Sequence, residues 1–158
     1  MDESLCHLLD GLWTGGSALL CEPGVRSVYA AELARRADAV DRAPTEGPEQ
    51  VRARARAAEA LCSVVHLPPG APGSWWHRYA EDAAGIALDA ARAARAAGHD
   101  VEAFLPAGPY REAHRHTRAD DVRLTAGGRP GETLACLRLW LRVGDQVYPG
   151  RVVYRGDA

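Results

Sequence analysis

The sequence contains no lysine and no asparagine, and it has only one phenylalanine, one methionine and one isoleucine. All 19 basic residues are therefore arginines, and with 21 acidic residues the formal net charge is −2. A strongly basic surface, of the kind that nucleic acid and anionic membranes attract, is not expected. We therefore expect no nucleic-acid partner and no membrane partner. A small molecule or a protein partner is expected instead, and a homodimer is compatible with this composition.

Long apolar runs and paired cysteines are also missing. The longest stretch without a charged residue or a histidine, Gly11 to Cys21, is too short to cross a bilayer, and Asp2 and Glu3 stand where a secretory signal needs positive charge. The four cysteines are scattered without a CxxC pair, which is typical of neither a zinc knuckle nor a disulfide framework. We expect a cytoplasmic protein whose thiols are reduced.

The apolar residues that are present, 47% of the chain, are largely alanine, which favours a core of closely packed helices. A chain of 158 residues fits a single domain, mainly helical over residues 1–98 and mainly β over residues 99–158. Apolar spacing and capping residues predict helices over 3–13, from Ser27 to about Arg42, from Pro48 onward, and from Trp75 to Ala97 behind a Ser74 cap.

Strand-like segments dominate the second half of the chain. They cover 61–67, 100–105, 122–125, 134–143 and 146–154, and for 61–67 the end of the preceding helix is the alternative. Gly144-Asp145 suits a tight hairpin turn. The order strand, long helix, strand over 61–105 predicts a βαβ unit with two parallel strands. The predicted fold class is α+β, with a helical N-terminal half packed on a mostly antiparallel C-terminal sheet.

The segment around His114 and His116 is the strongest candidate for a functional site. On a strand, residues two apart point to the same face, so both imidazoles would reach one metal ion. Asp120 would add a carboxylate ligand, and His77 or Glu112 would complete the site. The alternative is that both histidines are exposed polar residues in a charged loop.

These residues resemble the first metal-binding motif of the cupins. That motif runs Gly, five residues, His-x-His, three or four residues, Glu, six residues, Gly. The same spacing occurs here in Gly108, His114, His116, Asp120 and Gly127, with Asp in place of Glu. The resemblance implies Fe, Mn, Ni or Zn, and an oxygenase, an isomerase or a small-ligand binder.

The second cupin motif is matched less completely. Gly144-Asp145 and Pro149-Gly150 resemble its opening, but the histidine that completes the metal site in that family does not follow. This departure puts the third protein ligand in doubt.

His77 and Glu81 lie one helical turn apart and form a second candidate, as a catalytic base and the residue that orients it. The alternative is an ordinary surface pair. Adjacent Trp75 and Trp76 point about 100° apart on a helix, so one of them is expected to be exposed and to line a ligand pocket, with Trp140 nearby. The alternative there is a contact with the preceding proline-rich loop.

Two functions are therefore predicted. In the first, the protein is a metal-binding domain that binds or acts on a small organic molecule, with the metal as a Lewis acid or oxygen activator. In the second, it is a non-enzymatic interaction or accessory protein whose partner meets an exposed tryptophan and an open sheet edge. The sequence leaves open whether the protein is an enzyme.

Overall fold

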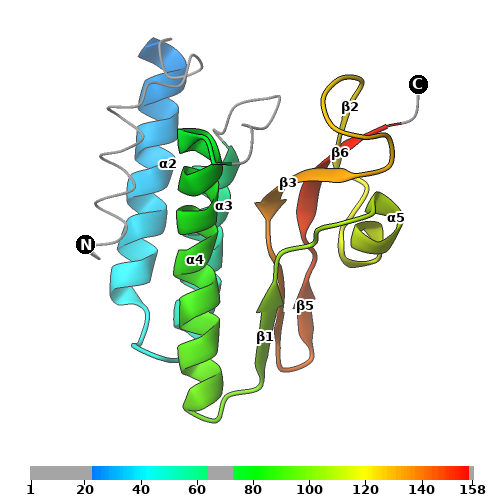
Figure 1. Cartoon of the computed structure of the whole chain (residues 1–158). Helices are drawn as coiled ribbons and strands as arrows, with labels where there is room; N and C mark the ends of the chain where they lie inside the picture. The colour runs from blue at the N-terminus through cyan, green and yellow to red at the C-terminus, as the bar shows by residue number, and fades with distance from the viewer. Residues whose placement is uncertain (1–22, 64–72, 157–158) are drawn as a thin grey trace.

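The computed structural model describes residues 23–63 and 73–156, in which a layer of helices packs against two small sheets (Figure 1). The helices α2 (Pro23–Arg42), α3 (Pro48–Ser63) and α4 (Trp75–Ala96) come first in the chain. The strands follow, with a short helical segment made of α5 (Tyr110–Ala113) and the 3₁₀ helix η2 (His114–His116). The predicted α+β class is confirmed. The helix predicted over 3–13 lies outside the described residues.

Proline and serine set the starts of the long helices. Pro48 opens α3 as predicted, because proline needs no hydrogen bond for an N–H in the first turn. Ser74 caps α4, and its hydroxyl accepts a hydrogen bond of 3.2 Å from the backbone N–H of His77. The prediction that Ser27 caps α2 is wrong. The helix begins at Pro23, and Ser27 lies inside it, donating to the carbonyl of Gly24.

The end of α4 is set by Gly98, which has a φ of +88°. The N–H of His99 donates to the carbonyl of Ala94, and the N–H of Gly98 donates to that of Arg95, both at 3.0 Å. These two bonds satisfy carbonyls that have no partner within the helix. The chain then turns directly into β1 (Val101–Phe104), so this terminus fixes where the first strand meets the helical layer.

Two buried clusters hold the layers together. The first joins α2, α3 and α4 through Leu33, Val40, Leu61, Tyr79 and Ile86, with alanines between them. The second joins α3 and α4 to the sheet. It includes Val51, Ala58, Ala87, Ala91, Ala94, Val101, Leu139, Leu141 and Val143. The buried alanines of α4 therefore lie against β1 and β4, where small side chains let the helix approach closely.

The strands form two three-stranded sheets, ordered β1-β4-β5 and β2-β6-β3. Their bounds are β2 (Val122–Leu124), β3 (Thr133–Arg138), β4 (Trp140–Val143), β5 (Gln146–Tyr148) and β6 (Arg151–Arg155). The first sheet is antiparallel throughout, and in the second β2 runs parallel to β6. Val143 pairs with Gln146, which confirms the predicted two-residue turn at Gly144-Asp145.

Each arm of this hairpin is interrupted once. One arm passes from β3 to β4 at Leu139, and the other passes from β5 to β6 at Pro149-Gly150, where the sequence predicted continuous strands. Pro149 has no N–H to donate to a neighbouring strand. An added Cβ at Gly150 would lie 3.0 Å from the carbonyl oxygen of Arg138, so only glycine fits there without a shift. The hairpin therefore changes sheets at this point.

The predicted strand over 61–67 is wrong where the structure describes it. Leu61–Ser63 is the last turn of α3, and Leu61 and Cys62 are buried in the first cluster, so helix packing decides the conformation of this apolar stretch. Residues 64–67 lie outside the described residues. Within those residues β1 pairs only with β4, and antiparallel, so the parallel pair of a βαβ unit is not found there. No helix in the described ranges has the length and apolar character needed to span a membrane.

Candidate functional site

His114 and His116 do not lie on a strand, so this part of the prediction is wrong. Pro109 starts a helical turn, and the N–H groups of Glu112 and Ala113 donate to its carbonyl at 2.9 and 3.1 Å. The turn tightens into η2, on which both histidines lie. Residues two apart on a helical segment point in different directions, so the geometric reason for a shared metal ion is absent.

The ring of His114 faces a buried carboxylate. Its Nδ1 lies 3.1 Å from Tyr110 Oη and 3.5 Å from Asp121 Oδ2, and the Asp121 side chain is only 3% exposed. Asp121 also accepts hydrogen bonds from Thr117 Oγ1 (2.5 Å), Tyr110 Oη (3.1 Å) and the N–H of Val152 (2.9 Å). Burial and the hydrogen bond to Asp121 raise the pKa of Tyr110. This cluster joins the helical turn to β6.

The other two predicted ligands turn elsewhere. The His116 ring meets Phe104 edge-on at 4.9 Å and Trp140 at 6.0 Å between ring centroids. Asp120 pairs with Arg138 Nη2 at 3.2 Å and with Arg151 Nε at 3.7 Å. Among the described residues no group of three or more His, Cys, Asp and Glu side chains is arranged to hold a metal ion. The predicted site therefore does not fit as proposed, and metal binding stays a prediction.

The predicted catalytic pair forms the expected contact on the surface of α4. His77 Nε2 lies 3.5 Å from Glu81 Oε1, with 41% and 64% of the two side chains exposed. Nearby, Trp75 is partly exposed and stacks on Tyr79 at 5.2 Å. A catalytic role for the pair stays a prediction.

The described contacts do not bring Trp75 and Trp140 together in one ligand pocket, because their rings stack on different partners. Trp75 stacks on Tyr79 in α4, whereas Trp140 stacks on Phe104 at 4.9 Å, at the end of β1. Trp76 lies in α4, and its side chain is outside the described part of the structure.

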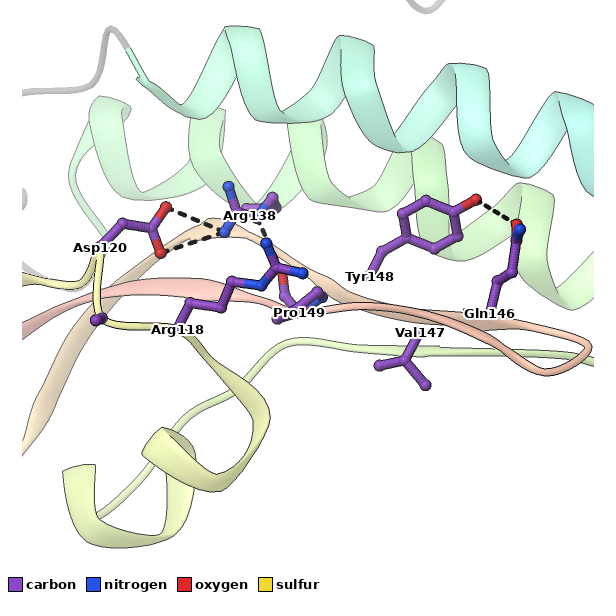
Figure 2. A pocket seen from close by; sticks show the side chains of 8 residues that line it. Arg118, Asp120, Arg138, Gln146, Val147, Tyr148 and Pro149 are labelled. Atoms are coloured by element: carbon purple, nitrogen blue, oxygen red, sulfur yellow. Dashed lines mark hydrogen bonds and ion pairs between the residues drawn. The ribbon is translucent and has the colours of Figure 1, made fainter.

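A hollow of about 970 Å³ lies beside β5, where the hairpin changes sheets. We call it the β5 hollow, and Figure 2 shows its lining. It is lined by Arg118, Ala119, Asp120, Arg138, Gln146, Val147, Tyr148 and Pro149. Of the predicted site residues whose side chains are described, only Asp120 lines it.

Arg138 organises one end of the β5 hollow. Its Nε donates to the carbonyl of Pro149 at 2.8 Å, and its Nη2 contacts Asp120 (Figure 2). Its Nη1 lies 3.1 Å from Glu59 on α3, so the same side chain ties the sheet to the helical layer. Glu59 in turn lies 3.6 Å from Arg36 Nη1 on α2. With one carboxylate on each side, Arg138 is held in place.

Arg118 is the unpaired charge of the β5 hollow. It is exposed, and within residues 23–63 and 73–156 its guanidinium has no hydrogen-bond or ion-pair partner. Figure 2 shows it reaching toward Pro149 and Arg138. Among the described residues Asp120 is the only carboxylate that lines the hollow, and it is already paired with two arginines. The hollow therefore has a positive charge available for an acidic ligand.

The edge of β5 is open in the described residues, because β4 is the only strand paired with it. Gln146 and Tyr148 are the hydrogen-bonded partners of Val143 and Leu141, since they are the first and third residues after a two-residue turn. Val147 between them therefore turns its N–H and C=O toward the open edge. Its side chain is 50% exposed and points to the opposite side of the strand from Tyr148 (Figure 2).

The sequence contained part of the signal for this site. Arg138 alternates with Leu137 and Leu139, which places it on the opposite face of the strand from these leucines, but a continuous strand was predicted through Pro149-Gly150. The side chain of Arg138 contacts Asp120, which is 18 positions away in the sequence. It also contacts Glu59 on α3, which is 79 positions away. No local pattern predicts such pairs.

Comparison with known proteins gives no match to a protein-family model, to a curated protein sequence or to a solved structure.

Proposed function

We propose that the protein is a binding domain that takes up an extended, acidic segment of a protein partner along the open edge of β5. One observation carries the proposal: the unpaired guanidinium of Arg118 lies beside a strand edge that no other described strand covers. A partner segment pairing with that edge would bring its side chains over the β5 hollow.

The backbone contribution to this binding is small. β5 has three residues, and only Val147 offers its N–H and C=O to the open edge, so an added strand gains about two backbone hydrogen bonds. Short edges of this kind do not pair indiscriminately. Most of the selectivity must then come from side chains, with Arg118 recognising a carboxylate and Val147 contacting an apolar residue.

An enclosed small-molecule site is supported less well by the same residues. Ligand pockets surround most of their ligand, whereas the β5 hollow is open to the surroundings along an exposed strand edge. A metal-dependent function at His114, His116 and Asp120 stays a prediction, and metal analysis of the purified protein tests it.

The test uses a short synthetic peptide in which glutamate alternates with valine, titrated into isotope-labelled protein and followed by amide chemical shifts. We expect the amides of Val147 and its neighbours to move. Exchanging glutamate for lysine in the peptide, or Arg118→Glu in the protein, should weaken binding by about tenfold or more, which corresponds to about 1.4 kcal/mol.

Two further variants separate edge pairing from general charge attraction. Val147→Pro removes the outward N–H and should weaken binding by a similar factor, while an edge strand tolerates the proline. Arg115→Glu is the matched control, because Arg115 is an exposed arginine on η2 that does not line the β5 hollow. Equal loss in Arg115→Glu and Arg118→Glu, or unchanged binding in Arg118→Glu, would contradict the proposal.

A further inference from the structure

A second charged feature lies between α2 and α3, away from the β5 hollow. A groove of about 340 Å³ runs between these two helices, and we call it the arginine groove. It is lined by Arg35, Arg36, Ala39, Arg42, Ala43, Glu49, Arg52, Ala53 and Arg56. The three alanines supply small side chains between the charged ones, and Glu49 is the only carboxylate that the described part of the chain contributes to the lining. Five arginines therefore face one groove of a protein whose net charge is −2.

Two of these arginines are fixed by ion pairs. Glu32 Oε1 lies 2.7 Å from Arg35 Nη2 and 2.6 Å from Arg36 Nε. Arg36 also contacts Glu59 and donates to the backbone carbonyl of Arg56. Arg36 is thus held between the helices by acceptors on both of them, which makes one wall of the groove rigid.

The other three arginines have little or no compensation. Arg52 has a buried Nε with no hydrogen-bond partner, and its Nη2 reaches only Gln146 Oε1 at 3.5 Å. Arg42 donates its Nε to the backbone carbonyl of Asp38 at 3.1 Å, which neutralises no charge. The guanidinium of Arg56 has no partner within the described ranges. The groove therefore combines excess positive charge with unsatisfied donors.

We propose that the arginine groove binds a phosphorylated small molecule. The planar guanidinium matches the oxygens of a phosphate group in bidentate geometry, and several guanidiniums are needed only for a ligand with several negative charges. A volume of about 340 Å³ is at the lower end of the range for small-molecule sites. A bound phosphate would supply the acceptors that the Arg56 guanidinium lacks, would pair with the charge of Arg52, and would reduce the repulsion among the five cations.

The site is distinct from the β5 hollow. The two linings share no residue, although Arg52 of the groove contacts Gln146 of the hollow. Loss of one binding activity therefore does not imply loss of the other, and the two proposals are tested with different probes.

The experiment is calorimetric titration of the whole protein with tripolyphosphate. We expect saturable binding to one site, weakened about tenfold for each guanidinium removed in Arg52→Gln and Arg56→Gln, because each loses a charge-assisted hydrogen bond. Glu49→Gln should tighten binding, since it removes a carboxylate that would repel the phosphate. The matched control is Arg92→Gln, on the exposed face of α4 beside Asp89, where no change is expected.

Circular dichroism of each variant checks that it is folded. If Arg52→Gln does not fold, variants of the exposed residues Arg42 and Glu49 still test the site. We expect Arg42→Gln to weaken the binding of tripolyphosphate and Glu49→Gln to tighten it. Unchanged affinity in both, or equal loss in Arg92→Gln, would overturn the site. Equal affinity for citrate would overturn the phosphate class, and tighter binding of a single-stranded oligonucleotide than of tripolyphosphate would overturn the small-molecule class.

Discussion

At the scale of single residues, Asp120 and Asp121 show how neighbours of the same type serve different purposes. The Asp120 side chain is 46% exposed and borders the β5 hollow, where it pairs with Arg138 and Arg151. The Asp121 side chain turns inward, is 3% exposed and accepts hydrogen bonds from a tyrosine, a threonine and a backbone N–H. The carboxylate of Asp120 partly neutralises the arginines at the hollow, whereas the carboxylate of Asp121 holds the segment around η2 against β6 through hydrogen bonds.

The first prediction follows from this difference. Asp121→Ala removes the acceptor of the N–H of Val152, a residue that is fully buried, together with the acceptors of Thr117 and Tyr110. We expect the free energy of unfolding to fall by about 2–4 kcal/mol, because orphaned buried donors cost about 1–3 kcal/mol each. Urea unfolding measures it.

Asp120→Ala is the control, one position away. It removes partly exposed ion pairs, so the expected loss is about 1 kcal/mol or less. If both substitutions lower the free energy of unfolding by the same amount, Asp121 does not hold the η2 segment against β6.

At the scale of the elements, local signals at the helix ends decide where the chain turns toward the sheet. α4 starts behind the Ser74 cap and ends at Gly98, and the first strand begins three residues later. The hairpin shows the opposite case. Its turn at Gly144-Asp145 is local, but its interruption at Pro149-Gly150 depends on the carbonyl of Arg138 in the other arm.

The second prediction concerns the cap. Ser74→Ala leaves the N–H of His77 without its side-chain acceptor, and we expect a loss of about 1 kcal/mol in the free energy of unfolding. The matched control is Ser27→Ala inside α2, where the hydroxyl only bonds back to the carbonyl of Gly24. Alanine is a good helix former there, so stability should not fall. Equal losses at the two serines would show that Ser74 does not act as a cap.

At the scale of the whole molecule, ion pairs run from the outer helix to the sheet. Glu32 pairs with Arg36 on α2, Arg36 reaches Glu59 on α3, and Glu59 pairs with Arg138 on β3. Asp100 and Arg142 form another pair, joining the start of β1 to β4 at 2.8 Å. These ion pairs lie outside an alanine-rich core. Small side chains fix the relative orientation of two packed layers only weakly, so the ion pairs help to fix how the helices sit on the sheet.

The third prediction is a dependence of stability on acid. Hydrogen bonds from Arg35 and Arg36 lower the pKa of Glu32 from 4.5 to about 2, and the hydrogen bond from Arg142 lowers the pKa of Asp100. A carboxyl whose pKa is lower in the folded state stabilises the fold above its unfolded pKa, and that stabilisation is lost as the pH falls. We therefore expect the free energy of unfolding to decrease from about pH 4.5 to about pH 2.

The decrease should be smaller in Glu32→Gln, and high salt should reduce the difference because these groups are exposed. Glu112→Gln is the control, since its carboxylate approaches Arg111 only to 4.0 Å. Denaturant unfolding at a series of pH values measures the slopes. A Glu32→Gln variant with the slope of the original protein would contradict the prediction.

What the sequence determined by itself is local in origin. The starts of α3 and α4, the stop at Gly98, the hairpin turn and the alternation of buried leucines with arginines all follow from backbone propensities and periodicity acting within a few residues. The α+β class follows from them. At Leu61 the sequence favoured a strand over a helix end, and it did not predict the interruptions in the hairpin arms, because packing against distant elements overrides local preference at both places.

Only the tertiary structure decided which side chains meet. Spacing alone placed His114, His116 and Asp120 together, but the helical turn after Pro109 sends each to different partners. Arg118 meets the β5 edge only because β3 and β4 fold back beside it, and the five arginines meet only because α2 and α3 pack side by side. The energy of a contact depends on distance in space, and a single sequence specifies that distance only through the complete fold.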